Sequence, residues 1–179
     1  MPHFGNVAAS IALTALPILT GCSAERAPIS DHSLTELCER PTQFFAQVWH
    51  FAEPIVGEPG FVDRANPGKV GAGSGCAFTA NGALLAHVSV IRFVPGLHEP
   101  PDTADTISVG EQLVKAWDQG DGTALLFETD SDGWKAGFSL TVGADLKTNK
   151  PQATSDQIDA TAKELVEILG EFKGPDRKS

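Results

Sequence analysis

Ser74 lies in the stretch that comes nearest to a nucleophile or nucleotide-binding motif, Gly71-Ala72-Gly73-Ser74-Gly75. An activated serine on a G-x-S-x-G turn needs glycine two residues before and two residues after it, but these positions hold Ala72 and Cys76. A dinucleotide-binding loop needs a third glycine and a strand-to-helix turn, and the sequence predicts neither here. We therefore interpret this stretch as a flexible approach to Cys76.

The histidines and their neighbouring acids are too dispersed to predict a zinc site. His50 and Glu53 lie three residues apart, while His87, His98 and Glu99 lie elsewhere in the chain. There is no H-E-x-x-H motif and no other close pair of ligands. We expect these histidines at the surface or at helix ends, and we predict no bound metal.

Asp130-Ser131-Asp132-Gly133 begins like a calcium-binding loop. Such a loop also needs a third oxygen ligand before the glycine and a glutamate about six residues after it, and neither is present. The sequence therefore predicts a hairpin turn here. Since no catalytic acid pair and no Ser/His/Asp set stands out either, it predicts a protein that is not an enzyme and uses no cofactor.

Cys22 offers a different chemistry, because a thiol is the strongest nucleophile available to accept a lipid. It follows an apolar run from Val7 to Leu19, which is too short to span a bilayer but has the length of a signal-peptide core. The first charged residue is Glu25, and the first six residues lack the Lys or Arg with which signal peptides usually begin.

The tetrad Leu19-Thr20-Gly21-Cys22 resembles the lipobox of bacterial lipoproteins. The resemblance implies a signal peptide over residues 1–21, cleavage before Cys22, and a palmitate-type lipid on Cys22 that holds the protein to the extracytoplasmic face of the cell membrane. The alternative is an ordinary buried helix over residues 7–21. Pro17 and the polar stretch that follows argue against that helix.

Cys38 and Cys76 are the two cysteines that remain. Outside the cytoplasm such a pair usually forms a disulfide, which we expect here. On the chain-entropy model this crosslink would stabilise the fold by roughly 4 kcal/mol. Two free buried thiols are the alternative.

The formal net charge of −10 indicates which partners to expect. Acidic and basic residues are interspersed and no basic stripe is present, so we do not expect the protein to bind nucleic acid. An acidic surface also repels anionic lipid headgroups, which leaves the acyl chain as the expected contact with the membrane.

The chain is expected to contain one folded domain over residues 33–174, after a flexible tether over residues 22–32 and before a disordered tail over residues 175–179. Ser33 and Glu36 have the spacing of a helix capping box, and a second helical segment follows Pro41. Pro and Gly residues then predict a long loop from Glu53 to Gly75.

Two hairpins are predicted around Asn81-Gly82 and Asp132-Gly133, because both dipeptides suit tight turns and the flanking residues alternate. Between them, Ser108 and Glu111 have the spacing of another capping box, which predicts a short helix. A last helix is expected from Asp156 to Phe172. The predicted fold is an α+β two-layer sandwich, with an antiparallel sheet of about four strands, helices on one face and the order α-β-β-α-β-β-α.

The chain also resembles the small cell-envelope lipoproteins of actinobacteria, many of unknown function. The likeness rests on Leu19 to Cys22, a cysteine in the first helix, the Gly-Ser-Gly-Cys-Ala-Phe stretch at 73–78 and the terminal helix at 156–172. It implies an αβ sandwich that binds a partner protein or an apolar ligand. It supplies no motif from which site residues could be assigned.

The function expected from these features is a membrane-anchored, non-catalytic binding or accessory module for another cell-envelope protein. Phe61 and Val62 are its candidate partner-binding residues, because they are adjacent apolar residues of the long loop, flanked by Asp63 and Arg64, and such loops are often functional. The alternative is a carrier of a lipid or another hydrophobic ligand. An open apolar cleft between sheet and helices would favour the carrier, and a filled core with an exposed apolar patch would favour the binding module.

Overall fold

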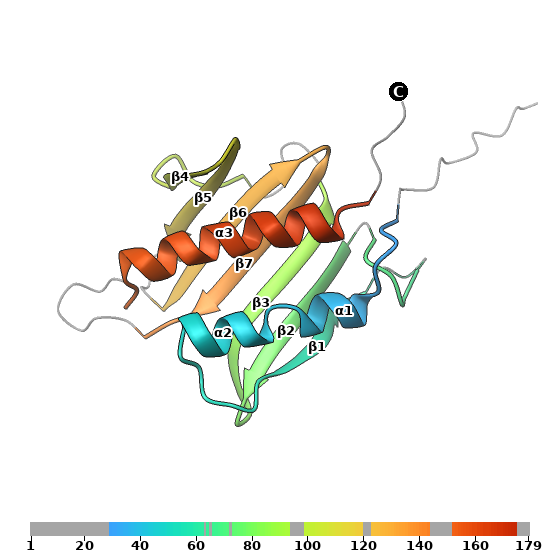
Figure 1. Cartoon of the computed structure of the whole chain (residues 1–179), viewed down its shortest axis with the longest axis horizontal. Coiled ribbons are helices and arrows are strands. Elements are labelled where there is room, and N and C mark those ends of the chain that lie inside the picture. The colour runs from blue at the N-terminus through green and yellow to red at the C-terminus, as the bar shows by residue number, and fades with distance from the viewer. Residues whose placement is uncertain are drawn as a thin grey trace, which may run out of the picture.

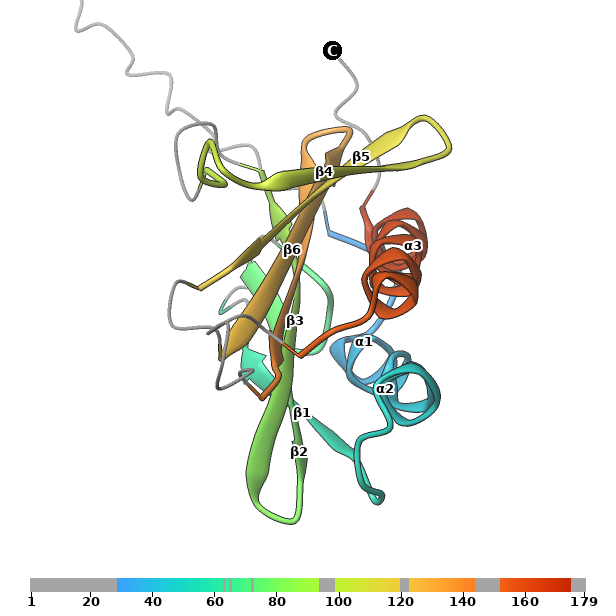
Figure 2. The ribbon, with the colours of Figure 1, turned by 90° about the vertical axis from the view of Figure 1, so that its left-hand side faces the viewer.

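The computed structural model describes residues 29–62, 64, 66–71, 73–93, 99–119, 123–143 and 152–174. The expected signal peptide, Cys22 and the expected tail at 175–179 lie outside this range. In the described part, a seven-stranded antiparallel sheet carries all three helices on one face (Figures 1 and 2). In chain order the elements are α1 (Leu34–Glu39), α2 (Thr42–Val48), β1 (Val56–Phe61), β2 (Gly73–Ala80), β3 (Ala83–Arg92), β4 (Asp105–Val109), β5 (Gln112–Asp118), β6 (Ala124–Ser131), β7 (Trp134–Thr141) and α3 (Ser155–Phe172).

The sheet order is β1-β2-β3-β7-β6-β5-β4, which makes β1 and β4 the two edge strands. The β2–β3 hairpin turns at Asn81 and Gly82, whose φ angles are +50° and +78°. The β6–β7 hairpin turns in the same way at Asp132 and Gly133, with φ angles of +53° and +75°. Both predicted hairpins are therefore confirmed, and the mixed α+β class with an antiparallel sheet is correct.

The predicted helix after Ser108 is wrong. This segment forms the β4–β5 hairpin, in which Val109 pairs with Gln112 across a turn that contains Gly110 at φ +58°. Ser108 lies in β4 opposite Leu113, so it does not cap a helix. Valine, isoleucine and threonine favour strands, and this preference together with the tight turn outweighs the helical spacing of the apolar residues.

The predicted long loop from Glu53 to Gly75 is also corrected, because it contains the edge strand β1. Pro59 has no N–H, and an edge strand can tolerate that loss on its outer side. The register shifts between Pro59 and Phe61, so the strand carries a bulge-like irregularity. With β1, β4 and β5 added, the sheet has seven strands instead of about four, and the order of elements differs from the predicted one.

The capping box predicted at Ser33 is present, and the structure shows a second capping box at Thr154. The Ser33 hydroxyl accepts a hydrogen bond from the Glu36 amide at 3.2 Å, and the Ser33 amide donates to the Glu36 carboxylate at 2.6 Å. Thr154 and Gln157 make the equivalent pair of bonds at the start of α3. These bonds satisfy amides that have no partner in the first turn of a helix, which fixes where each helix begins.

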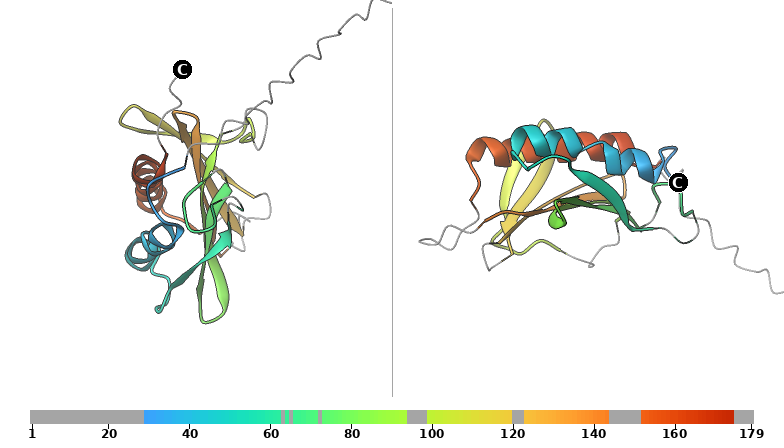
Figure 3. Two further views of the ribbon diagram at one scale, coloured as in Figure 1. Left: turned by 90° about the vertical axis from the view of Figure 1, so that its right-hand side faces the viewer. Right: turned by 90° about the horizontal axis from the view of Figure 1, so that it is seen from below.

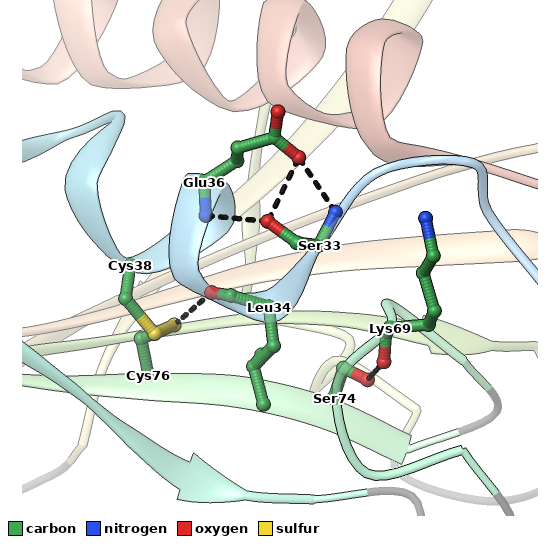
Figure 4. Close-up of a disulfide and its surroundings, with 7 residues drawn as sticks. All are labelled: Ser33, Leu34, Glu36, Cys38, Lys69, Ser74 and Cys76. Carbon is green, nitrogen blue, oxygen red and sulfur yellow. Dashed lines mark hydrogen bonds between the residues drawn. A yellow bond between two sulfur atoms is a disulfide. The ribbon is translucent and has the colours of Figure 1, made fainter.

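A disulfide joins Cys38 in α1 to Cys76 in β2, with a Cα–Cα distance of 5.3 Å, so the predicted pairing is confirmed (Figure 4). Helix α1 also contacts the edge strand β1, and there Gly57 is needed for close approach. A Cβ atom at Gly57 would lie 2.1 Å from the Cys38 carbonyl oxygen and 2.7 Å from the Phe78 ring. The disulfide and this contact hold α1 tightly against the β1 side of the sheet.

The space between sheet and helices is filled by one continuous cluster of buried side chains that runs from Cys38 and Phe45 to Phe172. Several polar links connect the helices above it. The Trp49 indole N–H donates to the Thr161 hydroxyl at 3.1 Å, and the Arg40 guanidinium contacts Glu164 at 2.5 Å. The segment before α1 is attached to the domain as well, since the amide of the buried Ser30 donates to the Val70 carbonyl at 2.9 Å.

Candidate functional site

A cleft of about 440 Å³ lies between the β4 side of the sheet and the beginning of α3. The three views place the β4–β5 hairpin beside α3 at this side of the molecule (Figures 1, 2 and 3). Its described lining residues come from β4, β5, β6 and the first turns of α3, and they are Asp105, Ile107, Ala116, Trp117, Asp118, Leu125, Ala153, Ser155, Ile158 and Asp159.

The floor of the cleft is apolar. Ala116 and Leu125 are 5% and 7% exposed and belong to the core cluster, while Ile107, Ala153 and Ile158 are half-buried and pack against it. Alanine at positions 116 and 153 leaves space that a larger side chain would fill. Side chains of the core therefore form the floor of the cleft. Its volume lies in the range of ordinary ligand pockets.

The rim of the cleft is acidic. It carries the carboxylates of Asp105, Asp118 and Asp159, and no Lys, Arg or His occurs among the described lining residues. Asp105 and Asp159 have no ion-pair partner in the part of the chain that the structure describes. The cleft thus combines an apolar floor with a negative rim, which suits a cationic and partly apolar group.

The start of α3 borders this cleft but does not make it an anion site. A free helix N-terminus attracts anions through its unpaired amides. Here Thr154 and Gln157 already satisfy the cap, and Asp156 adds a negative charge in the first turn. Together with Asp159, these groups leave the local field negative.

A hollow of about 570 Å³ is larger and lies between α2 and the segment before β1. It is lined by Thr42, Gln43, Glu53, Pro54 and Ile55. Of these residues only Ile55 packs against the core, so the hollow offers little apolar floor. We regard the cleft beside α3 as the better candidate site for that reason.

The sequence-predicted candidates Phe61 and Val62 lie elsewhere, at the end of edge strand β1. They are 64% and 41% exposed. Phe61 lies over the β2 backbone, where a Cβ at Gly75 would be 3.3 Å from its ring. Phe61 is the last residue of β1 and Val62 follows it directly, and neither residue lines the cleft.

The residues at which the sequence suggested catalysis or metal binding make hydrogen bonds or ion pairs within the fold. Ser74 is buried, accepts a hydrogen bond from the Gly71 amide at 2.9 Å and donates one to the Lys69 carbonyl at 3.3 Å. Asp132 pairs with Lys173, and this hydrogen bond lowers the pKa of the Asp132 carboxyl. Among the described residues, which exclude His98, no group of three potential ligands is close enough to hold a metal.

Among the described residues, Arg40 and three glutamates of α3 form a cluster of charges. The Arg40 guanidinium lies 2.5 Å from Glu164, 3.4 Å from Glu167 and 3.2 Å from Glu171. Burial raises the pKa of the Glu164 carboxyl, and the opposing attraction of Arg40 does not fully offset that effect. Because the guanidinium contacts all three carboxylates, the cluster links the end of α1 to α3.

Sequence reasoning missed the cleft because its residues come from two separated segments, 105–125 and 153–159. The sequence predicts a helix in part of the first segment, and this prediction does not show which of its residues face α3 from a strand. A usable signal was present, since Asp105, Ile107 and Val109 alternate along a strand whose inner face meets the helix.

No protein-family model matches the chain, and neither a curated protein nor a solved structure matches it. Within the described residues, none of the helices is long and apolar enough to cross a membrane.

Proposed function

We propose that this chain is a lipid-anchored, extracytoplasmic lipoprotein whose folded domain is a non-catalytic binding module for another cell-envelope protein. The observation that carries the proposal is the exposed apolar surface of edge strand β1. Val56 is 46%, Phe61 64% and Val62 41% exposed. We refer to Phe61 and Val62 together as the β1 patch.

Single exposed apolar residues are common on soluble proteins and need no explanation. The β1 patch differs because its two residues are consecutive, include an aromatic ring and end a strand at the free edge of a sheet. Aromatic side chains held in a fixed position are favoured anchors in protein interfaces, because little conformational entropy is lost on binding.

The filled core also favours a binding module over a lipid carrier. A carrier needs an enclosed apolar cavity for its ligand. Between sheet and helices the described side chains instead form a continuous buried cluster.

The β1 patch is tested by the double variant Phe61→Ser/Val62→Ser. The measurement is chemical crosslinking of the anchored protein to its envelope partner. We expect the amount of partner crosslinked to the variant to fall at least several-fold. The melting temperature should stay unchanged, because both side chains are exposed. The matched control is Leu84→Ser/Leu113→Ser, which removes two apolar side chains that are 44% and 57% exposed elsewhere. Equal capture by wild type and the patch variant would reject this surface, as would equal loss in both variants.

A hydrophobic-ligand carrier is the second candidate, because the cleft beside α3 has an apolar floor between sheet and helix. Its three rim carboxylates count against an acyl chain, which offers no positive charge. Mass spectrometry of the native protein, purified from membranes in mild detergent, separates the two functions. A lipid bound in fixed stoichiometry, in addition to the lipid attached to Cys22, would favour the carrier.

The anchor is tested separately by Cys22→Ala. We expect this variant to leave the membrane fraction and to lack the mass of the attached lipid, since an acyl chain supplies the membrane affinity in this proposal. Continued acylation and membrane retention of Cys22→Ala would refute the lipoprotein assignment. The control is Ser10→Ala, a change within the expected signal peptide. It should leave both the membrane association and the lipid attachment intact.

A further inference from the structure

Two separate hollows lie beside helix α3 on the β4–β5 side of the sheet. The cleft of about 440 Å³ is lined in part by edge strand β4, and a smaller hollow of about 110 Å³, bordered by Gln112, Val166 and Gly170 among others, lies further along α3. We call the two hollows together the β4–α3 groove and define it by Asp105, Ile107, Ile158, Asp159 and Val166. In Figures 1 and 2 the β4–β5 hairpin runs across the direction of α3 and lies close to the helix.

The strand that forms one wall of this groove has a free backbone edge. β4 is the last strand in the sheet and pairs with β5 on one side. In the part of the chain that the structure describes, no backbone group outside β5 is hydrogen-bonded to residues 105–109. Such an edge presents a row of donors and acceptors to which an extended peptide can add as a further strand.

The side chains beside that edge define what the added strand should carry. Asp105, Ile107 and Val109 alternate along β4 on the face towards α3, and Ile107 and Val109 are half-buried against the core. Across the groove, Ile158 and Val166 are half-buried on α3. Apolar side chains projecting inward from an added strand would meet this aliphatic surface.

We propose that the β4–α3 groove binds an extended segment of a partner protein as an eighth strand of the sheet, with apolar side chains on the floor and one or two lysines or arginines at the acidic end. Asp105 and Asp159 supply the complementary charge, and neither has an ion-pair partner among the described residues. The protein's net charge of −10 attracts such a segment from a distance.

A peptide suits this groove better than the other occupants of similar polarity. It supplies N–H and C=O groups to the β4 edge, apolar side chains to Ile107 and Ile158, and cations to Asp105. An acyl chain satisfies only the aliphatic surface. A small organic cation satisfies the charge but leaves the strand edge without a partner.

The inference rests on the proposed function in one respect, namely that the occupant belongs to another protein. It assigns a different surface from the β1 patch, on the opposite edge of the sheet. Binding at either surface can therefore fail without affecting the other, and peptide binding to the purified protein does not depend on an envelope partner being captured.

The probe is the fluorescein-labelled peptide Thr-Val-Thr-Val-Thr-Lys-Thr-Lys, titrated with the full-length protein and followed by fluorescence anisotropy. Its alternation places Val and Lys on one face of a strand. Two matched peptides have the lysines replaced by glutamates, or all of the backbone amide nitrogens methylated. We expect the glutamate peptide not to bind, and the methylated peptide to bind about tenfold more weakly, because strand pairing is lost.

The protein variants test the site itself. Asp105→Asn/Asp159→Asn should weaken binding about fivefold and reduce its salt dependence, as expected for two partly exposed ion pairs. The matched control Glu39→Gln/Glu99→Gln removes two exposed charges elsewhere and should change the dissociation constant less than twofold. Amide exchange of the complex should show new protection in β4 and none in β1.

Four outcomes would overturn the inference. One is equal affinity for the alternating and methylated peptides, which means that no strand is formed. Another is equal weakening by the groove variant and the control variant, which means that the peptide responds to total charge. The third is new amide protection in β1 and none in β4, and the fourth is no binding of the alternating peptide at low salt.

Discussion

The two edges of the sheet are exposed in different ways. At the β1 edge, Pro59 removes a backbone donor and the register shifts, so the backbone is poorly suited to pairing while the side chains of Val56 and Phe61 remain exposed. At the β4 edge no proline occurs and the backbone is open, but the adjoining groove is acidic. β1 can therefore present side chains to a partner, whereas β4 can present its backbone.

The edges also differ in how they are attached. β1 pairs with β2 and contacts α1, and the Cys38–Cys76 disulfide joins α1 to β2. β4 and β5 are covered by the N-terminal part of α3 through noncovalent packing. The predictions below test whether the β1 side is the rigid one.

Removal of the disulfide should have the largest effect. We expect Cys38→Ser/Cys76→Ser to lower the free energy of unfolding by about 4 kcal/mol, because the crosslink restricts the unfolded chain. Urea unfolding measures the loss, and wild-type protein with a reductant is the control. Hydrogen exchange should increase more in β1 and β2 than in β4 and β5; an equal increase on both sides would contradict the comparison.

Gly57→Ala should have the next largest effect. The added methyl group would lie 2.1 Å from a backbone oxygen of α1, so either the helix or β1 must move. Overpacking of this kind costs about 1 to 3 kcal/mol. The matched change Gly68→Ala, where nothing lies within 4 Å of the new Cβ, should alter the free energy of unfolding by less than about 0.5 kcal/mol.

Glu164→Gln tests the ionic link between the two sides. Burial raises the pKa of Glu164 above its ordinary value near 4.5, so the folded protein binds that proton more tightly than the unfolded chain does. The resulting stability is fully present below the unfolded pKa and is lost as pH rises through the folded pKa. Unfolding free energies measured from acid to neutral pH should therefore fall for wild type relative to Glu164→Gln. A difference that stays constant or grows with pH would contradict this assignment.

Pro59→Thr should have the smallest effect on stability, about 0.5 to 1 kcal/mol, because the unfolded chain gains freedom. Its effect on association should be clearer, since threonine restores an N–H at the β1 edge. We expect more self-association than in wild type by sedimentation velocity. Unchanged association would mean that other features protect this edge.

Much of the fold followed from local sequence chemistry. The turns at Asn81-Gly82 and Asp132-Gly133 and the capping box at Ser33 each depend on neighbouring residues alone, and all three are present. The β4–β5 hairpin was missed because its apolar residues fit a helical spacing as well as two short strands. β1 was missed because Gly57, Pro59 and Gly60 give it the composition of a loop.

The candidate site was less predictable than the fold. Phe61 and Val62 were found because they are the apolar residues of a polar stretch, and the structure places both at the surface. The β4–α3 groove depends on how far a twisted edge hairpin lies from a helix about 50 residues later, and no local pattern specifies that separation.

The hydrogen bonds that attach residues 30–34 to the domain have a mechanical consequence. Tension on the segment before Ile29 would first load the backbone hydrogen bonds between Ser30 and Val70 and between Leu34 and Gly68. Just beyond them, the Cys38–Cys76 disulfide would carry the force into β2. The β4 edge lies across the sheet from this load path. A pull on an anchored chain would therefore be resisted by the covalently joined side, while the groove beside α3 would keep its shape.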